Sequence, residues 1–422
     1  MSARFVSLLG IVAFIGMAWA LSSHRKKFPW RTVLTGVGLQ VMFGFLILNT
    51  RAGAKFFQSV ERAFGKLLGF AEQGTTMVFG PLANQDALKQ GLALESGFVF
   101  VVTVTGTIVL VSSLSSLLYH YGILQVVVRG VAWVMQRVMG TSGSESLAAA
   151  ANIFMGQTEA PLVIKPYLER MTRSEVMALM VGGMATIAGG VLAAYVSFGI
   201  SAGHLLTASV MSAPAALMMA KIILPETEPS ETAAGALAKI PRETHNGLDA
   251  LCRGASDGVM LSINVMAMLI AFVAVVALAN YLVSFGLRGV GVREDAPLQV
   301  FFGWINAPCA WLMGIPWKDC TEIGRVLGER IVLNEFLGYL SLAKVKDALD
   351  PRSVTLVTYA LCGFANFASI AIQIGGIGSL SPSRRPDLAQ LGLRAMLGGL
   401  LACYLTACIA GVLTGSGAPV TK

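Results

Sequence analysis

The stretch Gly156-Gln157-Thr158-Glu159, together with Asn334-Glu335 in the second half, decides how this chain folds. Each motif places a carboxylate within a strongly apolar half of the sequence. Carboxylates in such surroundings are costly and rarely occur there without a function. The two motifs also occupy equivalent places in what reads as a duplicated unit. Together they predict a membrane transporter whose site lies near the middle of the bilayer.

The composition supports a membrane protein. The chain has 422 residues, of which 55% are hydrophobic and 13% are charged, and its mean hydropathy is +0.70. These values exclude an ordinary soluble protein and indicate a polytopic membrane protein. The frequent glycines are typical of close helix contacts and of broken helices in membranes.

The formal net charge of +8 does not indicate a nucleic-acid partner. The basic residues are scattered among short loops, without interleaved aromatic residues, zinc-ligand spacing or a phosphate-binding Gly-Lys-Ser/Thr motif. All six cysteines lie in the second half, and none forms a Cys-x-x-Cys pair. We therefore expect free thiols, no bound structural metal and no organic cofactor.

The N-terminal apolar segment, Phe5 to Ser22, contains Ala18-Trp19-Ala20, which resembles a signal-peptidase site. A basic cluster from Arg25 to Arg31 follows it directly. Basic residues after an apolar span hold that flank in the cytoplasm. We expect a retained first helix with its N-terminus outside.

Further apolar segments predict the remaining membrane spans at about residues 33–48, 97–118, 175–199, 204–224, 258–285, 353–377 and 389–413. Residues 55–71 instead carry apolar side chains at helical spacing with charges between them, which predicts an amphipathic helix on the bilayer surface or against partner subunits. Arg129 and Arg137 interrupt the apolar run 122–139, which favours an interfacial helix.

The sequence repeats itself. The run from Leu124-Gln125-Val126 to Met135 corresponds to the run from Leu298-Gln299-Val300 to Met313. Each follows a long span and precedes a polar break, an acidic motif, a Gly/Ala-rich span and one further span. Each copy has an odd number of crossings, so the copies are expected to lie in opposite orientations, as in secondary transporters. Between them, 226–256 is predicted to be a solvated cytoplasmic linker.

Loop charges agree with this topology only in part. The positions predicted to lie inside carry Lys165, Arg170, Arg173, Lys221, Arg384 and Arg385. Those predicted to lie outside carry Lys344, Lys346 and Arg352.

The segments around the acidic motifs are too broken for simple crossings. Residues 144–171 and 320–343 each predict two short helices that meet at a polar tip and face a cavity rather than lipid. The Gly/Ala-rich spans carry small and polar side chains at 185–191 and 363–369. There the backbone can unwind and offer carbonyl groups.

These motifs resemble the concentrative nucleoside transporter family. Gly-Gln-Thr-Glu-Ala-Pro-Leu from Gly156, Val-Leu-Asn-Glu-Phe from Val332 and Gly-Phe-Ala-Asn-Phe from Gly363 carry the resemblance, which covers nearly the whole chain. The short N-terminal part is similar to bacterial members. The resemblance implies eight transmembrane helices, two opposed re-entrant hairpins in an inverted repeat, three interfacial helices, a homotrimer and cation-coupled uptake across the inner membrane.

The resemblance also implies roles for individual residues. Those expected to face the nucleobase are Gln157, Thr158, Glu159 and Val191. Those expected at the ribose are Glu335, Asn366 and Ser369, with Phe364 packed beside the substrate. Sodium ligands are expected from Asn152, the Met155 and Ile187 carbonyls and the Thr186 hydroxyl. Ala368 departs from the family, where a second Ser is common, so the hydrogen bonds around Ser369 are expected to differ.

The chemistry of these residues points the same way. A carboxylate accepts hydrogen bonds from a ribose diol, and the amide of Gln157 can serve either kind of group on a base edge. Sodium is a hard cation that favours oxygen ligands. The resulting organisation is a scaffold at 1–120, a first transport repeat at 121–225, the linker and a second repeat at 257–422.

Three alternatives follow from the same residues. A passive channel would need a continuous polar path with rings of charge, which discrete motifs do not provide. An embedded enzyme would need a nucleophile and a base, but the four histidines are predicted to be solvated and far from both motifs: His24, His120, His204 and His245. The remaining alternative is proton coupling through Glu335 or Glu159, because a carboxylate at low dielectric has a raised affinity for protons. Asn152 and Thr186 favour sodium.

Overall fold

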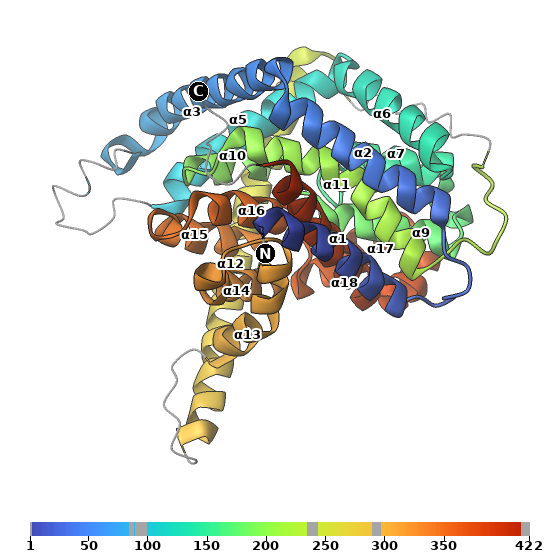
Figure 1. Ribbon diagram of the computed structural model, residues 1–422. Coiled ribbons are helices and arrows are strands. Elements are labelled where there is room, and N and C mark those ends of the chain that lie inside the picture. The colour runs from blue at the N-terminus through green and yellow to red at the C-terminus, as the bar shows by residue number, and fades with distance from the viewer. Residues whose placement is uncertain (1, 84–87, 89–98, 234–243, 289–296, 415–422) are drawn as a thin grey trace.

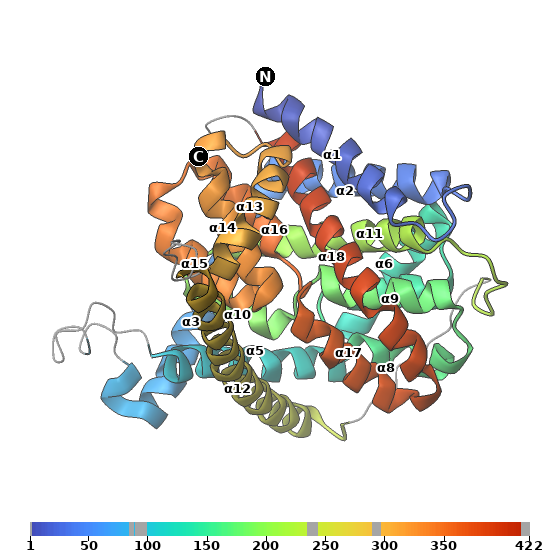
Figure 2. The same ribbon diagram turned by 90° about the horizontal axis from the view of Figure 1, so that it is seen from below.

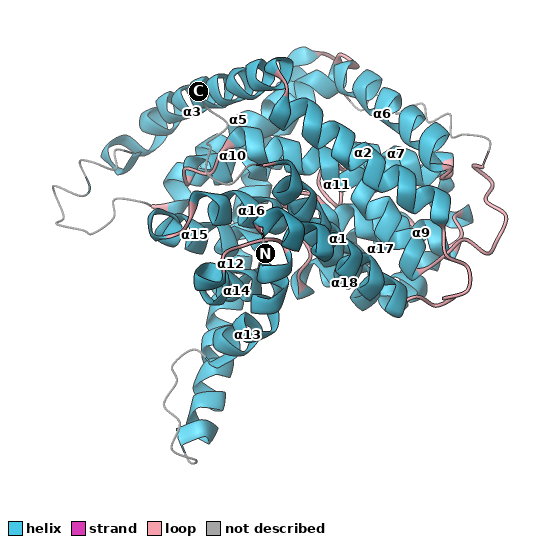
Figure 3. Ribbon diagram, viewed as in Figure 1, coloured by secondary structure: helices cyan, strands magenta, loops and turns pink. Residues whose placement is uncertain are grey.

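The computed structural model describes residues 2–83, 88, 99–233, 244–288 and 297–414 (Figure 1). Within these ranges the chain forms helices and no strand (Figure 3). This confirms the predicted all-α class.

The first half contains α1 (Ala3–Ala20), α2 (Trp30–Asn49), α3 (Arg51–Phe79), α5 (Phe100–His120), α6 (Ile123–Met139), α7 (Gly143–Ala151), α8 (Ala160–Val163), α9 (Arg173–Ala185), α10 (Gly189–Ser197) and α11 (Ala202–Ile223). The second half contains α12 (Gly247–Arg288), α13 (Pro297–Leu312), α14 (Trp317–Val332), α15 (Glu335–Val345), α16 (Pro351–Leu361), α17 (Phe367–Leu380) and α18 (Arg385–Leu413). Short 3-10 helices lie at Gly80–Ala83, Lys165–Arg170, Lys346–Ala348 and Pro382–Arg384.

Seven helical segments in the described ranges are long and apolar enough to cross a membrane. They correspond to seven of the predicted spans. The remaining predicted span, 353–377, is divided by residues 362–366 into α16 and α17, which have 11 and 14 residues and are too short to span alone. Residues 186–188 likewise separate α9 from α10. The predicted unwinding of both Gly/Ala-rich spans is therefore confirmed.

Helix α12 begins at Gly247, well before the predicted start at 258 and inside the predicted linker. The Asn246 side chain accepts a hydrogen bond from the Asp249 amide at 2.8 Å, which starts the helix. Gly254 and Gly258 then allow close packing on α5, because a Cβ at either position would lie 2.6–2.7 Å from the α5 backbone. This close packing on α5 stabilises a polar stretch of α12 that hydropathy alone does not identify as helical.

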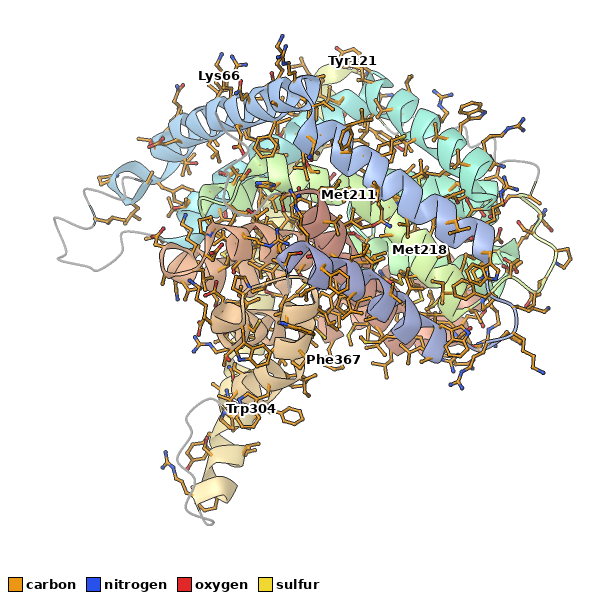
Figure 4. All side chains as sticks on the ribbon, viewed as in Figure 1. Lys66, Tyr121, Met211, Met218, Trp304 and Phe367 are labelled. Atoms are coloured by element: carbon orange, nitrogen blue, oxygen red, sulfur yellow. The ribbon has the colours of Figure 1, made fainter. Side chains whose placement is uncertain are left out.

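The core of the bundle consists of α9, α11 and α18. Met211 and Met218 of α11 are fully buried in the middle of the molecule, whereas Lys66 lies outside on α3 (Figure 4). A helix that is apolar on all sides, such as α11, must be surrounded by other helices. In contrast, α12 crosses α5 and projects from the body of the bundle (Figures 1 and 2).

Two outer helices are amphipathic: α3, as predicted, and α6, for which the sequence predicts an interfacial helix. Helix α3 extends beyond the expected 55–71 and buries only one face, through Gly53, Phe57, Ala71 and Thr75. Helix α6 buries residues spaced three or four apart, from Gln125 to Met139. Such stripes indicate helices that pack on the bundle by one side only.

Two helical hairpins enter the bundle. Hairpin 1 consists of α7, the irregular residues 152–159, α8 and the short helix Lys165–Arg170. Hairpin 2 consists of α14 and α15, which meet at Leu333-Asn334. Both therefore turn at the acidic motifs, as the sequence predicts.

One arginine lies at each end of α18, which has 29 residues and is about 43 Å long. At its start, the Arg384 guanidinium donates to the carbonyls of Glu169, at 2.9 Å, and Met171. At its end, the Arg352 guanidinium donates to the carbonyls of Gly411, at 2.8 Å, and Thr414, at 3.1 Å. These two arginines therefore attach both ends of α18 to neighbouring segments.

Two histidines are not solvated loop residues, contrary to expectation. His204 lies in the first turn of α11, where its Nδ1 is 3.2 Å from the Tyr359 hydroxyl and its ring packs on Phe57. His120 ends α5, and its Nδ1 is 2.6 Å from the Thr244 hydroxyl. The His204 ring thus lies between α3 and α16, and the His120 ring contacts the segment that precedes α12.

Lys221 also departs from its predicted role as a loop charge. It is buried in the last turn of α11, where its Nζ lies 2.7 Å from Glu145 of hairpin 1 and 3.2 Å from Glu226. Its Nζ also donates to the Ser174 hydroxyl of α9 at 2.9 Å. This ammonium group therefore joins the base of hairpin 1 to two core helices.

Replacing Lys221 by Met should destabilise the protein strongly, because Glu145 would remain buried without a cation. Breaking a buried ion pair by removing one partner costs about 3–5 kcal/mol. Denaturation midpoints of the purified protein would measure the effect. Lys344→Met, which removes an exposed ammonium from α15, is the control, and equal midpoints for the two variants would contradict the expectation.

Candidate functional site

The helix breaks at 186–188 and 362–366 lie against one another, and hairpin 1 contacts the first of them. The Phe364 amide donates to the Thr186 carbonyl at 3.3 Å, and the Gly189 amide donates to the Phe154 carbonyl at 3.2 Å. Gly363 permits this approach, because a Cβ there would lie 2.8 Å from the Met184 carbonyl oxygen. The interrupted helices of both halves thus form one polar region inside an apolar bundle.

Glu335 begins α15 and is 5% exposed. Its Oε1 accepts from the Tyr195 hydroxyl at 3.0 Å, and its Oε2 accepts from the Asn366 amide at 3.0 Å. The N-terminus of a helix favours a negative charge, and Asn334 caps the same helix by accepting from the Leu337 amide at 3.0 Å. These contacts stabilise a carboxylate and leave some of its four lone-pair positions for a ligand.

Asn366 joins this carboxylate to α17. Its Oδ1 caps α17 by accepting from the Ser369 amide at 2.9 Å, while its Nδ2 donates to Glu335. The two contacts fix the orientation of the amide, because only its oxygen can accept from a backbone N–H. One side chain therefore caps a helix and positions the carboxylate.

Gln157 links hairpin 1 to the same helix. Its Nε2 donates to the Ser369 hydroxyl at 3.1 Å, and its Oε1 accepts from Gln373 Nε2 at 3.1 Å. Gln157, Ser369, Asn366 and Glu335 therefore form a continuous chain of contacts between the two hairpin tips. The structure brings together four of the predicted substrate residues.

The other predicted substrate residues do not take part in these hydrogen bonds. Thr158 and Glu159 are exposed, and Glu159 Oε2 closes the hairpin turn by accepting from the Gly156 amide at 3.1 Å. Val191 is buried one turn before Tyr195 on α10, and Phe364 is half-buried in the α16–α17 break. Val191 and Phe364 offer apolar surface, and Thr158 and Glu159 offer polar groups that follow Gln157 directly in the chain.

Two of the four predicted ion ligands, Asn152 and Thr186, lie beside Gly182 of α9. Asn152 is fully buried, and neither its Oδ1 nor its Nδ2 has a hydrogen-bond partner. A Cβ on Gly182 would lie 3.0 Å from that Nδ2, and the Thr186 hydroxyl donates to the Gly182 carbonyl at 2.9 Å. Because an unpaired buried amide is costly, its oxygen suits a hard cation that the Thr186 hydroxyl oxygen could also coordinate.

Sequence reasoning missed two residues of this network, Tyr195 and Gln373. Both are fully buried. A helical-face argument could have found them, because Tyr195 follows Val191 by four residues and Gln373 follows Ser369 by four. A glutamine within the apolar α17 is itself a signal of a polar partner.

Three family models match the chain. One described as "Na+ dependent nucleoside transporter N-terminus" matches residues 9–82, one described as "Nucleoside recognition" matches 101–202, and one described as "Na+ dependent nucleoside transporter C-terminus" matches 204–411.

Related proteins align along nearly all of this chain. An uncharacterized transporter of Haemophilus influenzae is 43% identical, covering 98% of each chain. Sodium/nucleoside cotransporter 1 of Rattus norvegicus is 39% identical over 97% of this chain, which spans 64% of that protein.

Solved structures of a similar transporter, CNTnw, share the fold. Its inward-facing, substrate-bound state superposes with a TM-score of 0.91 at 38% identity, covering 99% of each chain. An outward-facing variant superposes with a TM-score of 0.92 at 37% identity, covering 98% of each.

These matches cover the hairpins, the helix breaks and the outer helices alike. The family contains transporters and not enzymes, which agrees with the expectation from the sequence. The chain belongs to the concentrative nucleoside transporter family.

Proposed function

We propose that this protein is a sodium-coupled nucleoside symporter of a bacterial inner membrane that works by alternating access. The buried carboxylate of Glu335, held between Tyr195 and Asn366 at a helix break, carries the proposal. The similarity to the rat sodium/nucleoside cotransporter 1 and to the inward- and outward-facing states of CNTnw supports it.

Glu335 is the proposed acceptor for the ribose diol. Tyr195 and Asn366 each occupy one of its oxygens, so lone pairs remain for substrate hydroxyls. A nucleoside is neutral, and its diol can donate two hydrogen bonds to a carboxylate without adding charge to the membrane interior. Asn366 and Ser369 border the same place, and Phe364 offers an apolar surface beside it.

The tip of hairpin 1 is the proposed base site. Gln157 is linked through Ser369 and Asn366 to the carboxylate, so a sugar at Glu335 would direct its base toward this tip. Thr158 and Glu159 are exposed there, and Val191 supplies an apolar contact. The distance between base and ribose sites is thus set by contacts between hairpin 1, α17 and hairpin 2.

Sodium is the proposed coupling ion, held by Asn152, Thr186 and the carbonyls of Met155 and Ile187. The unpaired amide of Asn152 supports this site. The ion would lie where hairpin 1 meets the α9–α10 break, so its binding would stabilise the hairpin that contacts the base. This arrangement favours sodium over protons at Glu335 or Glu159, since a proton would leave Asn152 without a partner.

Uptake into protein-containing vesicles should require sodium, and Thr186→Val should weaken sodium activation more than nucleoside affinity at saturating sodium. The substitution removes one ligand oxygen and keeps the shape. Thr358→Val is the matched control, because that buried hydroxyl also donates to the carbonyl four residues earlier. Identical sodium titrations for both variants, or sodium-independent uptake by the parent, would refute the ion site.

Glu335→Gln should nearly abolish transport, because a neutral amide has only one oxygen to accept from Tyr195, Asn366 and substrate. Glu159→Gln should mainly change base preference.

Removing the substrate 3′-OH should cost about 1.5–3 kcal/mol of binding free energy, or roughly ten- to over a hundredfold in affinity.

Competition between uridine and 3′-deoxyuridine measures this effect in the parent protein. Glu322→Gln provides the control for charge loss on hairpin 2, since Glu322 lies beside Arg325 on α14. If 3′-deoxyuridine competes as well as uridine, Glu335 does not bind the ribose.

We also propose a homotrimer in which residues 1–120 supply the contacts and the hairpins move against that scaffold. Helix α3, amphipathic and attached to the bundle by one face, supports this interface. Native mass measurement in lipid should give three copies of the 44.4 kDa chain. A monomeric mass would contradict the trimer, and cross-links confined to α12, which also exposes large apolar side chains such as Tyr281 and Phe285, would contradict the assigned interface.

A further inference from the structure

We propose that Gln373 is a positioning residue that fixes the direction in which Gln157 donates and accepts hydrogen bonds, and thereby sets base preference. The inference rests on the proposed function, because it assumes that the tip of hairpin 1 contacts the base. It predicts that the hairpin offers the base a hydrogen-bond donor. Nucleobases with an exocyclic carbonyl should then bind better than those with an exocyclic amino group.

The direction is set by a backbone carbonyl. Gln373 Nε2 lies 3.1 Å from the Met180 carbonyl oxygen of α9. A carbonyl can only accept, so the amino end of Gln373 must face it. The same Nε2 lies 3.1 Å from Gln157, which must therefore present its own oxygen. The amino end of Gln157 is left to donate to the Ser369 hydroxyl.

The surrounding packing prevents the two amides from turning over. Gln373 is 0% exposed and Gln157 is 7% exposed. Gly183 of α9 leaves just enough room for both, because a Cβ there would lie 2.7 Å from Gln373 Nε2 and 2.9 Å from the Gln157 Cβ. Inverting either amide would set two oxygens or two amino groups against each other in a buried place.

The fixed orientation of the two amides decides which end of Gln157 a base can contact. The oxygen of Gln157 points to the fully buried Gln373. Its amino group points to Ser369, which adjoins Asn366 and hence Glu335. The amino end of Gln157 therefore lies on the side of the ribose site. Its second N–H is the group proposed to donate to a base. The sequence suggests that the Gln157 amide can serve either kind of base edge, and the contact with Gln373 removes that freedom.

The test compares two pairs of nucleosides that differ at one exocyclic group and at the ring nitrogen beside it. Uridine and inosine carry a carbonyl where cytidine and adenosine carry an amino group. Dissociation constants would be measured on the full-length protein in lipid nanodiscs at saturating sodium. The parent should bind uridine more tightly than cytidine, and inosine more tightly than adenosine, by about five- to tenfold, the effect of one hydrogen bond.

Gln373→Leu should bring both ratios close to one, because Gln157 could then invert its amide. Its ratio for uridine over 3′-deoxyuridine should stay unchanged, which a general loss of structure would not allow. Gln40→Leu is the matched control, since Gln40 is another fully buried glutamine that donates to a backbone carbonyl, that of Gly36, outside the site. Gln373→Met serves as a second variant of similar length without the amide.

The outcomes separate the two proposals. If the parent binds no nucleoside, the proposed function fails. If it binds nucleosides but shows no preference for the carbonyl bases, or if Gln373→Leu and Gln373→Met keep the parental ratios, the positioning role of Gln373 is wrong.

Discussion

A helix that ends inside an apolar bundle leaves as many as four N–H groups or four C=O groups without partners, and hydrocarbon cannot replace them. The helix breaks of this protein meet the constraint by facing one another. The Phe364 amide binds the Thr186 carbonyl across the two halves of the chain. The fully buried guanidinium of Arg330 donates to the carbonyls of Ala360 and Gly363 at the end of α16. Each break therefore depends on groups from another segment, and the breaks assemble as a unit.

The side chains that satisfy these breaks are also those at the candidate site. Asn366 caps α17 and donates to Glu335, so the group that completes a helix also holds the buried carboxylate. Glu335 in turn begins a helix whose N-terminus favours its charge. Such double use explains why a buried glutamate and a buried asparagine lie together at the helix breaks. It also links the stability of the breaks to the presence of each site residue.

Much of the architecture could be predicted because apolar burial leaves a local signature in the sequence. The membrane spans, the amphipathic α3 and the unwound segments all lie where periodicity and small residues indicate. The start of α12 could not be predicted in this way, since Gly254 and Gly258 matter only through their contact with α5. Lys221 and His204 were misplaced for the same reason, because their partners come from distant segments.

The sequence by itself determined the helical class, the two acidic tips and most of the residues that meet between them. Hydropathy and helix periodicity depend on residues that are close together in the sequence. They can therefore be recognised without knowing where a segment lies in the fold. Only the tertiary structure decided how those residues are connected and oriented. The direction of the Gln157 amide follows from the Met180 carbonyl, which acts through Gln373, 193 residues away along the chain. A hydrogen bond depends on the position and angle of both partners, and no spacing rule within one segment specifies a partner in another.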